Sequence, residues 1–141
     1  MLATTDPHEA YRRSAFDARV QSGDTAALVL LCLEQAIAGM GGALLAHERN
    51  DPAARSRALT RALTAITALE MGVDRTAPLA SSLLQLYGAA RRAVLESVVG
   101  FQPELLTPVK ADLLEIEAAL RSAGRNQAAS GGDGAIAPAN G

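Results

Sequence analysis

The chain of 141 residues has no tryptophan, two phenylalanines, two tyrosines and a single cysteine, Cys32. So few aromatic residues disfavour a β-sandwich, and the apolar fraction of 49% comes mainly from alanine and leucine, which suit closely packed helices. One cysteine excludes an intramolecular disulfide and fits a reducing compartment. The polar opening MLATTDPHEAYRR lacks the apolar region of a signal peptide, so we expect a cytoplasmic protein.

Basic and catalytic residues are also sparse. The net charge of −2 offers no phosphate-binding surface, so we expect no nucleic-acid partner. The two histidines, His8 and His47, are paired in sequence with no nucleophile, and the Glu-x-x-His spacing of di-metal bundles is absent. Cys32 lies among leucines, where a thiol is usually a small inert hydrophobe. The sequence therefore predicts no enzymatic activity, no metal site and no cofactor.

The longest apolar run, TAALVLLCLEQAIAGMGGALLA, covers residues 25–46 and is interrupted past Thr25 only by Glu34 and Gln35. A helix that is apolar all round needs cover from its own domain, a bilayer or a partner protein. The run is long enough to cross a membrane, but Glu34 lies near its centre and no Lys/Arg cluster or aromatic belt flanks it. We therefore expect no membrane insertion, and we expect Glu34 and Gln35 to mark the strip of the helix that touches solvent.

Proline and glycine divide the rest of the chain into helices. The pairs Asp51-Pro52 and Thr107-Pro108 read as an N-cap followed by a first helical residue, and Gly72 and Gly100 read as helix ends. The predicted helices therefore cover about residues 25–46, 52–71, 78–99 and 108–120. Short loops between helices of similar length favour an antiparallel up-and-down four-helix bundle.

The two ends of the chain differ from this bundle. Residues 1–23 predict a short N-terminal helical arm that starts at Asp6-Pro7. Residues 124–141, GRNQAASGGDGAIAPANG, are small, polar and glycine-rich, so they predict a disordered tail. The expected fold is therefore all-α, with an arm at 1–23, a bundle at 24–123 and a tail at 124–141.

Short motifs occur in a fixed order over about residues 10–120. The N-terminal matches are Ala10-Tyr11, Val20, Leu28-Val29 and Ala36-Ile37, and the later ones are Ile66–Leu69, Leu83–Tyr87 and Arg92–Leu95. This order resembles the FliS family of flagellar secretion chaperones, whose members carry Ala-Tyr, then Val-x-Thr-Ala-Ser-Pro, then Leu-Val-x-Met-Leu-Tyr-Asp-Gly-Ala-Ile. The chain departs from that pattern at Thr25, Leu33 and Glu34-Gln35, which replace proline, tyrosine and Asp-Gly.

The resemblance implies a cytoplasmic chaperone that binds the disordered C-terminal segment of flagellin. It would prevent premature polymerisation and deliver its client to the flagellar type III export apparatus, whose components are further expected partners. The family's clients wrap around the bundle in apolar grooves, which the N-terminal arm can occupy in the free protein. The candidate client-binding residues are Tyr11, Val20, Leu28, Val29, Leu31, Ile37, Leu83, Leu86 and Tyr87.

Two other interpretations of the apolar surface stay open at this point. The chain could be a structural bundle that hides an apolar face by forming a homodimer, or a chaperone for a different secreted client. An enzyme would require a buried cluster of convergent polar side chains, which the sequence does not display.

Overall fold

The computed structural model describes residues 25–140, and the side chains of residues 25–126. It contains four helices, which are α2 (Thr25–Glu48), α3 (Pro52–Met71), α4 (Ala80–Val99) and α5 (Pro103–Asn140). Within residues 25–140 there is no strand, so the predicted all-α class is confirmed. The predicted arm at residues 1–23 lies outside the described residues.

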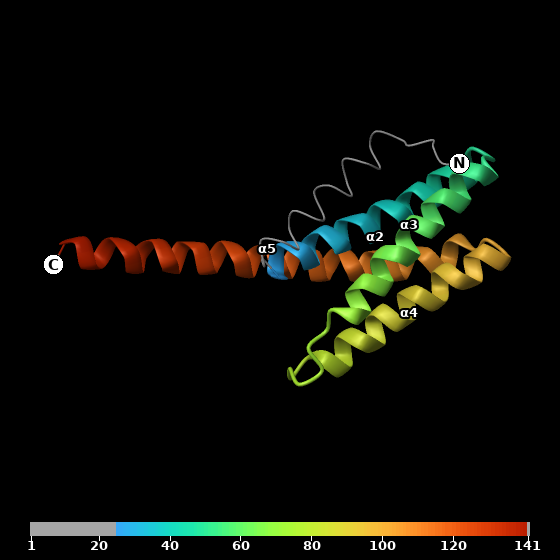
Figure 1. The fold of residues 1–141 in the computed structure, drawn as a ribbon. Helices are drawn as coiled ribbons and strands as arrows, with labels where there is room; N and C mark the ends of the chain where they lie inside the picture. Colours follow the sequence, from blue (N-terminus) through green and yellow to red (C-terminus); the bar gives the residue numbers. More distant parts are fainter. Residues whose placement is uncertain (1–24, 141) are drawn as a thin grey trace, which may run out of the picture.

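The helices form an up-and-down bundle, as the sequence predicted. Figure 1 shows that each helix runs opposite to the one before it. The main contacts join α2 to α3, α3 to α4, α4 to α5 and α5 back to α2. This cyclic order places α2 diagonally opposite α4, so the outer faces of these two helices point to opposite sides of the bundle.

All four helices contribute to one hydrophobic core. The largest fully buried side chains are Leu33, Met40, Ile66, Val94, Leu106 and Leu113. Small residues fill the remaining core positions and allow close packing, above all between α2 and α3. The closest approach is at Gly39, where an added Cβ would lie 2.7 Å from the backbone nitrogen of Ala62.

Helix α2 contributes seven buried residues to the bundle. Among the described helices, α2 is the one that is long and apolar enough to cross a membrane. Core helices of soluble proteins can have the same length and composition. The packing of α2 against α3 and α5 supplies protein cover for one face, as expected for a core helix.

The turn between α2 and α3 lies where the Asp51-Pro52 pair predicted a helix boundary. Asn50 has a φ of 53°, a left-handed conformation that asparagine tolerates and that reverses the chain after α2. Asp51 then caps α3, because its Oδ1 accepts a hydrogen bond of 3.1 Å from the backbone N–H of Ala54, and Pro52 occupies the first helical position.

The start of α5 differs from the prediction. The helix begins at Pro103, and Thr107 lies within it and donates its hydroxyl to the Pro103 carbonyl over 3.0 Å. Pro103 suits a first helical position because it has no N–H that would need a partner. Thr107-Pro108, predicted as the helix start, is therefore one turn inside α5.

The end of α5 also differs, since the structure continues the helix through residues 124–140, which the sequence predicted to be disordered. Every described side chain from Ala118 to Asn126 is exposed, and Figure 1 shows the C-terminal end of α5 projecting beyond the bundle. A helix already nucleated within a bundle needs only propagation to extend further, with one backbone hydrogen bond gained for each added residue.

Cys32 is expected to be unreactive in the native protein. Its side chain is 5% exposed, and burial raises the pKa of its thiol, so the nucleophilic thiolate is disfavoured. A thiol reagent such as DTNB should label the native chain slowly and the same chain in concentrated guanidinium chloride rapidly. Fast stoichiometric labelling without denaturant would show that α2 leaves the core readily.

Candidate interaction surfaces

One face of α2 remains apolar and points away from the bundle. It comprises Leu31, Ala38 and Leu45, which recur at helical spacing and are called here the α2 strip. Ala38 is exposed, Leu45 is 46% exposed and Leu31 is half-buried. The exposure of Ala38 and Leu45 shows that α3, α4 and α5 leave this part of the strip uncovered.

Glu34 and Gln35, the two polar residues in the middle of α2, bind the helices on either side of the strip. The Oε1 of Glu34 accepts a hydrogen bond of 2.7 Å from Arg121 of α5, which also contacts Glu117 at 3.2 Å. On the other side, Gln35 accepts a hydrogen bond of 3.0 Å from the Nε of Arg61 on α3.

The carboxylate of Glu34 is the first cause of the raised pKa of Arg121, and that of Glu117 is the second. Both members of the Glu34–Arg121 pair are well exposed, so it adds little to stability. As the sequence predicted, Glu34 lies at the solvated part of α2.

The candidate client-binding residues of α2 lie partly within the bundle. Leu28 and Leu31 are half-buried. Val29 and Ile37 are half-buried as well and pack against the hydrophobic core, so only part of each side chain is free for a partner. The structure thus brings these four residues onto one helix, but on different faces of it.

The candidates of α4 are more deeply placed. Leu83 and Leu86 are half-buried against the core, and Tyr87 is 3% exposed within it. Burial raises the pKa of Tyr87, with the nearby Cys32 as a second cause. Tyr87 therefore has a packing role in this conformation. The remaining candidates, Tyr11 and Val20, lie outside the described residues.

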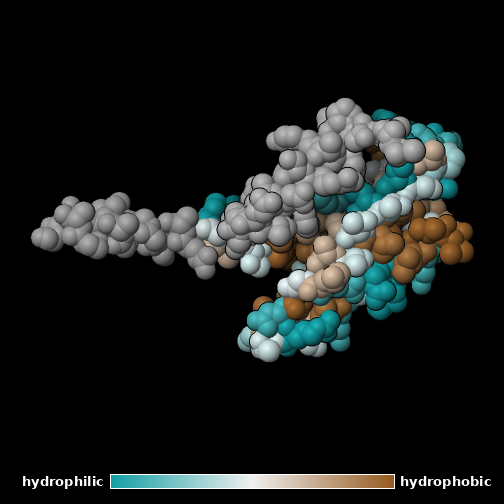
Figure 2. Space-filling view, in the orientation of Figure 1, coloured by the Kyte–Doolittle hydropathy of each residue, from teal (hydrophilic) through white to brown (hydrophobic). Residues whose placement is uncertain are grey.

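A second apolar surface, which the sequence did not single out, lies at the C-terminal end of α4. It is formed by Leu95, Val98 and Val99, which are 42%, 62% and 93% exposed and are called here the α4 patch. Figure 2 shows hydrophobic atoms gathered at this end of α4, beside the start of α5.

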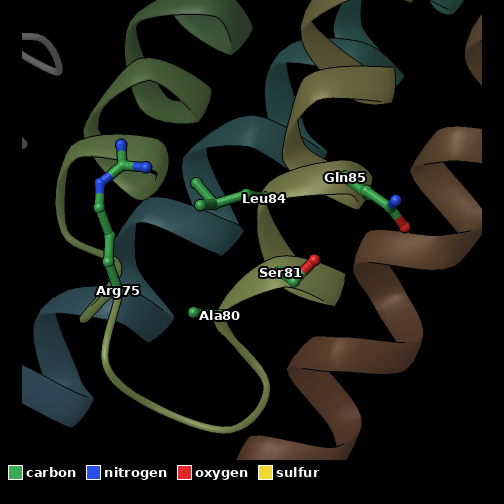
Figure 3. Close-up of a pocket in the computed structure, with 5 residues that line it drawn as sticks. All are labelled: Arg75, Ala80, Ser81, Leu84 and Gln85. Carbon is green, nitrogen blue, oxygen red and sulfur yellow. The ribbon is translucent and has the colours of Figure 1, made fainter.

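A shallow, open pocket lies where the α3–α4 loop meets α4 (Figure 3), and its lining residues are Arg75, Ala80, Ser81, Leu84 and Gln85. Leu84 points toward Arg75, whereas Gln85 points to the opposite side of α4. A catalytic site would require polar groups that converge on one point, and the polar groups of this pocket do not converge.

His47, one of the two histidines in the chain, is in an aromatic cluster. Its ring lies 4.5 Å from that of Phe101, and its Nδ1 lies 3.5 Å from the Nη1 of Arg55. The guanidinium of Arg55 also lies over Phe101, 5.3 Å from the ring centre. These contacts join the end of α2, the start of α3 and the α4–α5 loop. Among the described residues, no group of three or more His, Cys, Asp or Glu side chains could hold a metal ion.

A helical bundle with outward-facing apolar surfaces has the features of a protein-binding module. The family model of the flagellar protein FliS matches residues 7–127, and the chain therefore belongs to the FliS family. Membership implies a flagellar export chaperone and confirms the resemblance seen in the sequence motifs. No match was found among curated proteins.

Proposed function

We propose that this chain is a cytoplasmic chaperone that binds the disordered C-terminal segment of flagellin and delivers it to the flagellar export apparatus. The observation that carries the proposal is the family match over residues 7–127 together with the exposed α2 strip. A disordered client needs an apolar surface to fold against, and the strip is such a surface.

The composition of the α2 strip suits a client helix or extended segment. Ala38 is small and exposed, so a client backbone can approach α2 closely between the larger Leu31 and Leu45. Each square ångström of apolar surface buried there contributes about 25 cal/mol, which is offset by the cost of ordering the client. Glu34 and Arg121, at the α2–α5 edge, offer polar partners to the client backbone or side chains.

The half-buried candidates extend the proposed client surface. Leu28 lies in the N-terminal half of α2, three residues before the strip residue Leu31, whereas Leu83 and Leu86 belong to α4 on the other side of the bundle. A client that contacts both sets would have to wrap around the bundle. Tyr11 and Val20 stay proposed contacts from the arm.

The test is a titration of the full chain with a peptide of the flagellin C-terminal segment, followed by calorimetry and circular dichroism. We expect a one-to-one complex with added helicity. The variant Ala38→Glu places a carboxylate in the middle of the apolar strip, one turn from Glu34, and should weaken binding at least tenfold, because a charge would have to be desolvated in the interface.

The matched control is Ala53→Glu, which adds the same side chain at an exposed position of α3. Its affinity should equal that of the unsubstituted chain. If Ala38→Glu binds as tightly as this control, the α2 strip is not the client surface. If the unsubstituted chain shows no binding at micromolar concentrations, flagellin is not the client, and a homodimer in light scattering would then favour the structural-bundle interpretation.

A further inference from the structure

Lys110, the one lysine in the sequence, lies at the edge between α5 and the α2 strip. Its side chain is half-buried, and its Cε would lie 3.4 Å from a Cβ added at Gly41, so it extends from α5 onto α2. Gly41 is three residues after Ala38 and four before Leu45, which makes it their neighbour on the helix surface. The ammonium, one bond beyond the Cε, therefore lies beside the α2 strip.

No carboxylate of the neighbouring helix rows balances this charge. Within residues 25–126 no ion pair joins Lys110 to an Asp or Glu side chain. On α2 the two glutamates, Glu34 and Glu48, are each seven residues from Gly41, which is about 10 Å along a helix. On α5, Glu117 is also seven residues away, and like Glu34 it already contacts an arginine.

The other charged groups around the strip do not change this balance. The exposed carboxylates Glu104, Asp112 and Glu115 start about a third to half a turn around α5 from Lys110, away from α2. On the opposite edge of the strip, α3 contributes Arg61, which is positive as well. The part of the strip beside Lys110 is therefore apolar and bordered by an uncompensated cation.

Docking of a client on the strip would remove water from this ammonium. A desolvated cation without a partner costs far more than one that is paired and hydrogen-bonded. A carboxylate of the client at this position would supply a charge-assisted hydrogen bond, whereas a client cation would be repelled. The charge of one client side chain therefore decides how well the client fits beside Lys110.

We propose that Lys110 is a specificity-determining residue that selects a client segment with an acidic side chain at the edge of its apolar face. This inference rests on the proposed function, in which the α2 strip is the client surface. The apolar face of the client covers Leu31, Ala38 and Leu45, and its carboxylate accepts a hydrogen bond from the Nζ of Lys110. The charge pair fixes the register of the client along α2.

The probes are two fluorescent synthetic helical peptides, capped at both ends, with leucines on one face and either glutamate or lysine at the edge of that face. Titration with the full chain, measured by anisotropy, should show the glutamate peptide binding at least fivefold more tightly. The variant Lys110→Glu should invert this preference. Equal affinities for the unsubstituted chain would mean that Lys110 turns its ammonium into solvent, as long side chains can, and would overturn the proposal.

The matched control is Arg125→Glu, which makes the same change of net charge at an exposed position of the same helix. This variant should keep the preference of the unsubstituted chain for the glutamate peptide. If it inverts the preference as Lys110→Glu does, the net charge of the chain sets the selectivity and Lys110 does not.

Chemical labelling tests the contact without any substitution. Because Lys110 carries the one side-chain amine in the sequence, acylation by an N-hydroxysuccinimide ester can be followed there by mass spectrometry. Saturating glutamate peptide should slow its acylation at least fivefold relative to that of the N-terminal amine. An unchanged rate would show that the peptide docks elsewhere and would contradict the proposal.

The two proposals can fail separately, because neither probe contains a flagellin sequence. Selective probe binding without flagellin binding would refute flagellin as the client and leave the role of Lys110 intact. Flagellin binding without probe selectivity would refute only the role of Lys110. A chain that is dimeric in light scattering and binds neither probe would overturn the inference, since a second copy would then cover the strip.

Discussion

Replacing Gly39 with alanine is expected to destabilise the chain by about 3 kcal/mol, because the new methyl group has no room between α2 and α3. Its Cβ would lie 2.7 Å from the nitrogen of Ala62, 2.8 Å from the carbonyl oxygen of Ala58 and 2.9 Å from the Cβ of Ala62. Two of these atoms belong to the backbone of α3, so α3 must move away from α2 to relieve the overlap. Urea unfolding followed by circular dichroism measures the loss.

Gly41→Ala is the matched control on the same helix. Its added Cβ would meet only the Cε of Lys110, at 3.4 Å, which is near the end of a flexible side chain. Alanine has a helix propensity better than that of glycine by about 1 kcal/mol, so this variant should be as stable as the unsubstituted chain or more stable. If Gly39→Ala were as stable as Gly41→Ala, the close approach of α2 and α3 would be wrong.

Truncating Leu113 to alanine is expected to cost about 3 kcal/mol of unfolding free energy. Leu113 is fully buried, and α5 contributes it together with Leu106 to the core shared with α2 and α4. Removing three carbon atoms loses their transfer free energy and leaves a cavity that the surrounding helices fill only in part. In a domain of this size, the thermal midpoint should fall by roughly 10 °C or more.

The next residue provides the control. Leu114 is 41% exposed, so Leu114→Ala should change stability by less than about 1 kcal/mol, although the chemical change is identical. Similar losses in both variants would mean that α5 is rotated about its axis relative to the bundle described here. Differential scanning calorimetry of the two proteins distinguishes these outcomes.

The sequence contained the signals that define the bundle. Asp51 and Pro52 predicted the start of α3 after the turn, because each has a local conformational preference that needs no tertiary contact. The start of α5 was harder to predict, since Pro103 and Pro108 are both compatible with a first turn. Packing of Leu106 into the core favours the earlier start, and such packing cannot be predicted from the local conformational preferences of the residues.

The interaction surfaces were less predictable than the fold. Residues 25–46 are apolar all round, so no polar face indicates which side of α2 points outward, and Ala38 and Leu45 emerged only from the arrangement of the helices. The match at Leu83–Tyr87 placed Tyr87 among the client contacts, yet the rotation of α4 buries it beside Cys32. The sequence did contain a signal for the α4 patch, because the aliphatic residues Leu95, Val98 and Val99 lie close to the predicted helix end at Gly100.

The extension of α5 has a practical consequence for labelling the protein. With 38 residues, this helix is about 57 Å long, nearly twice the length of α4. Its far end is therefore distant from both the α2 strip and the α4 patch (Figure 1). An affinity tag, a fluorophore or a surface-immobilisation group fused after the last residue would leave both surfaces of the bundle accessible.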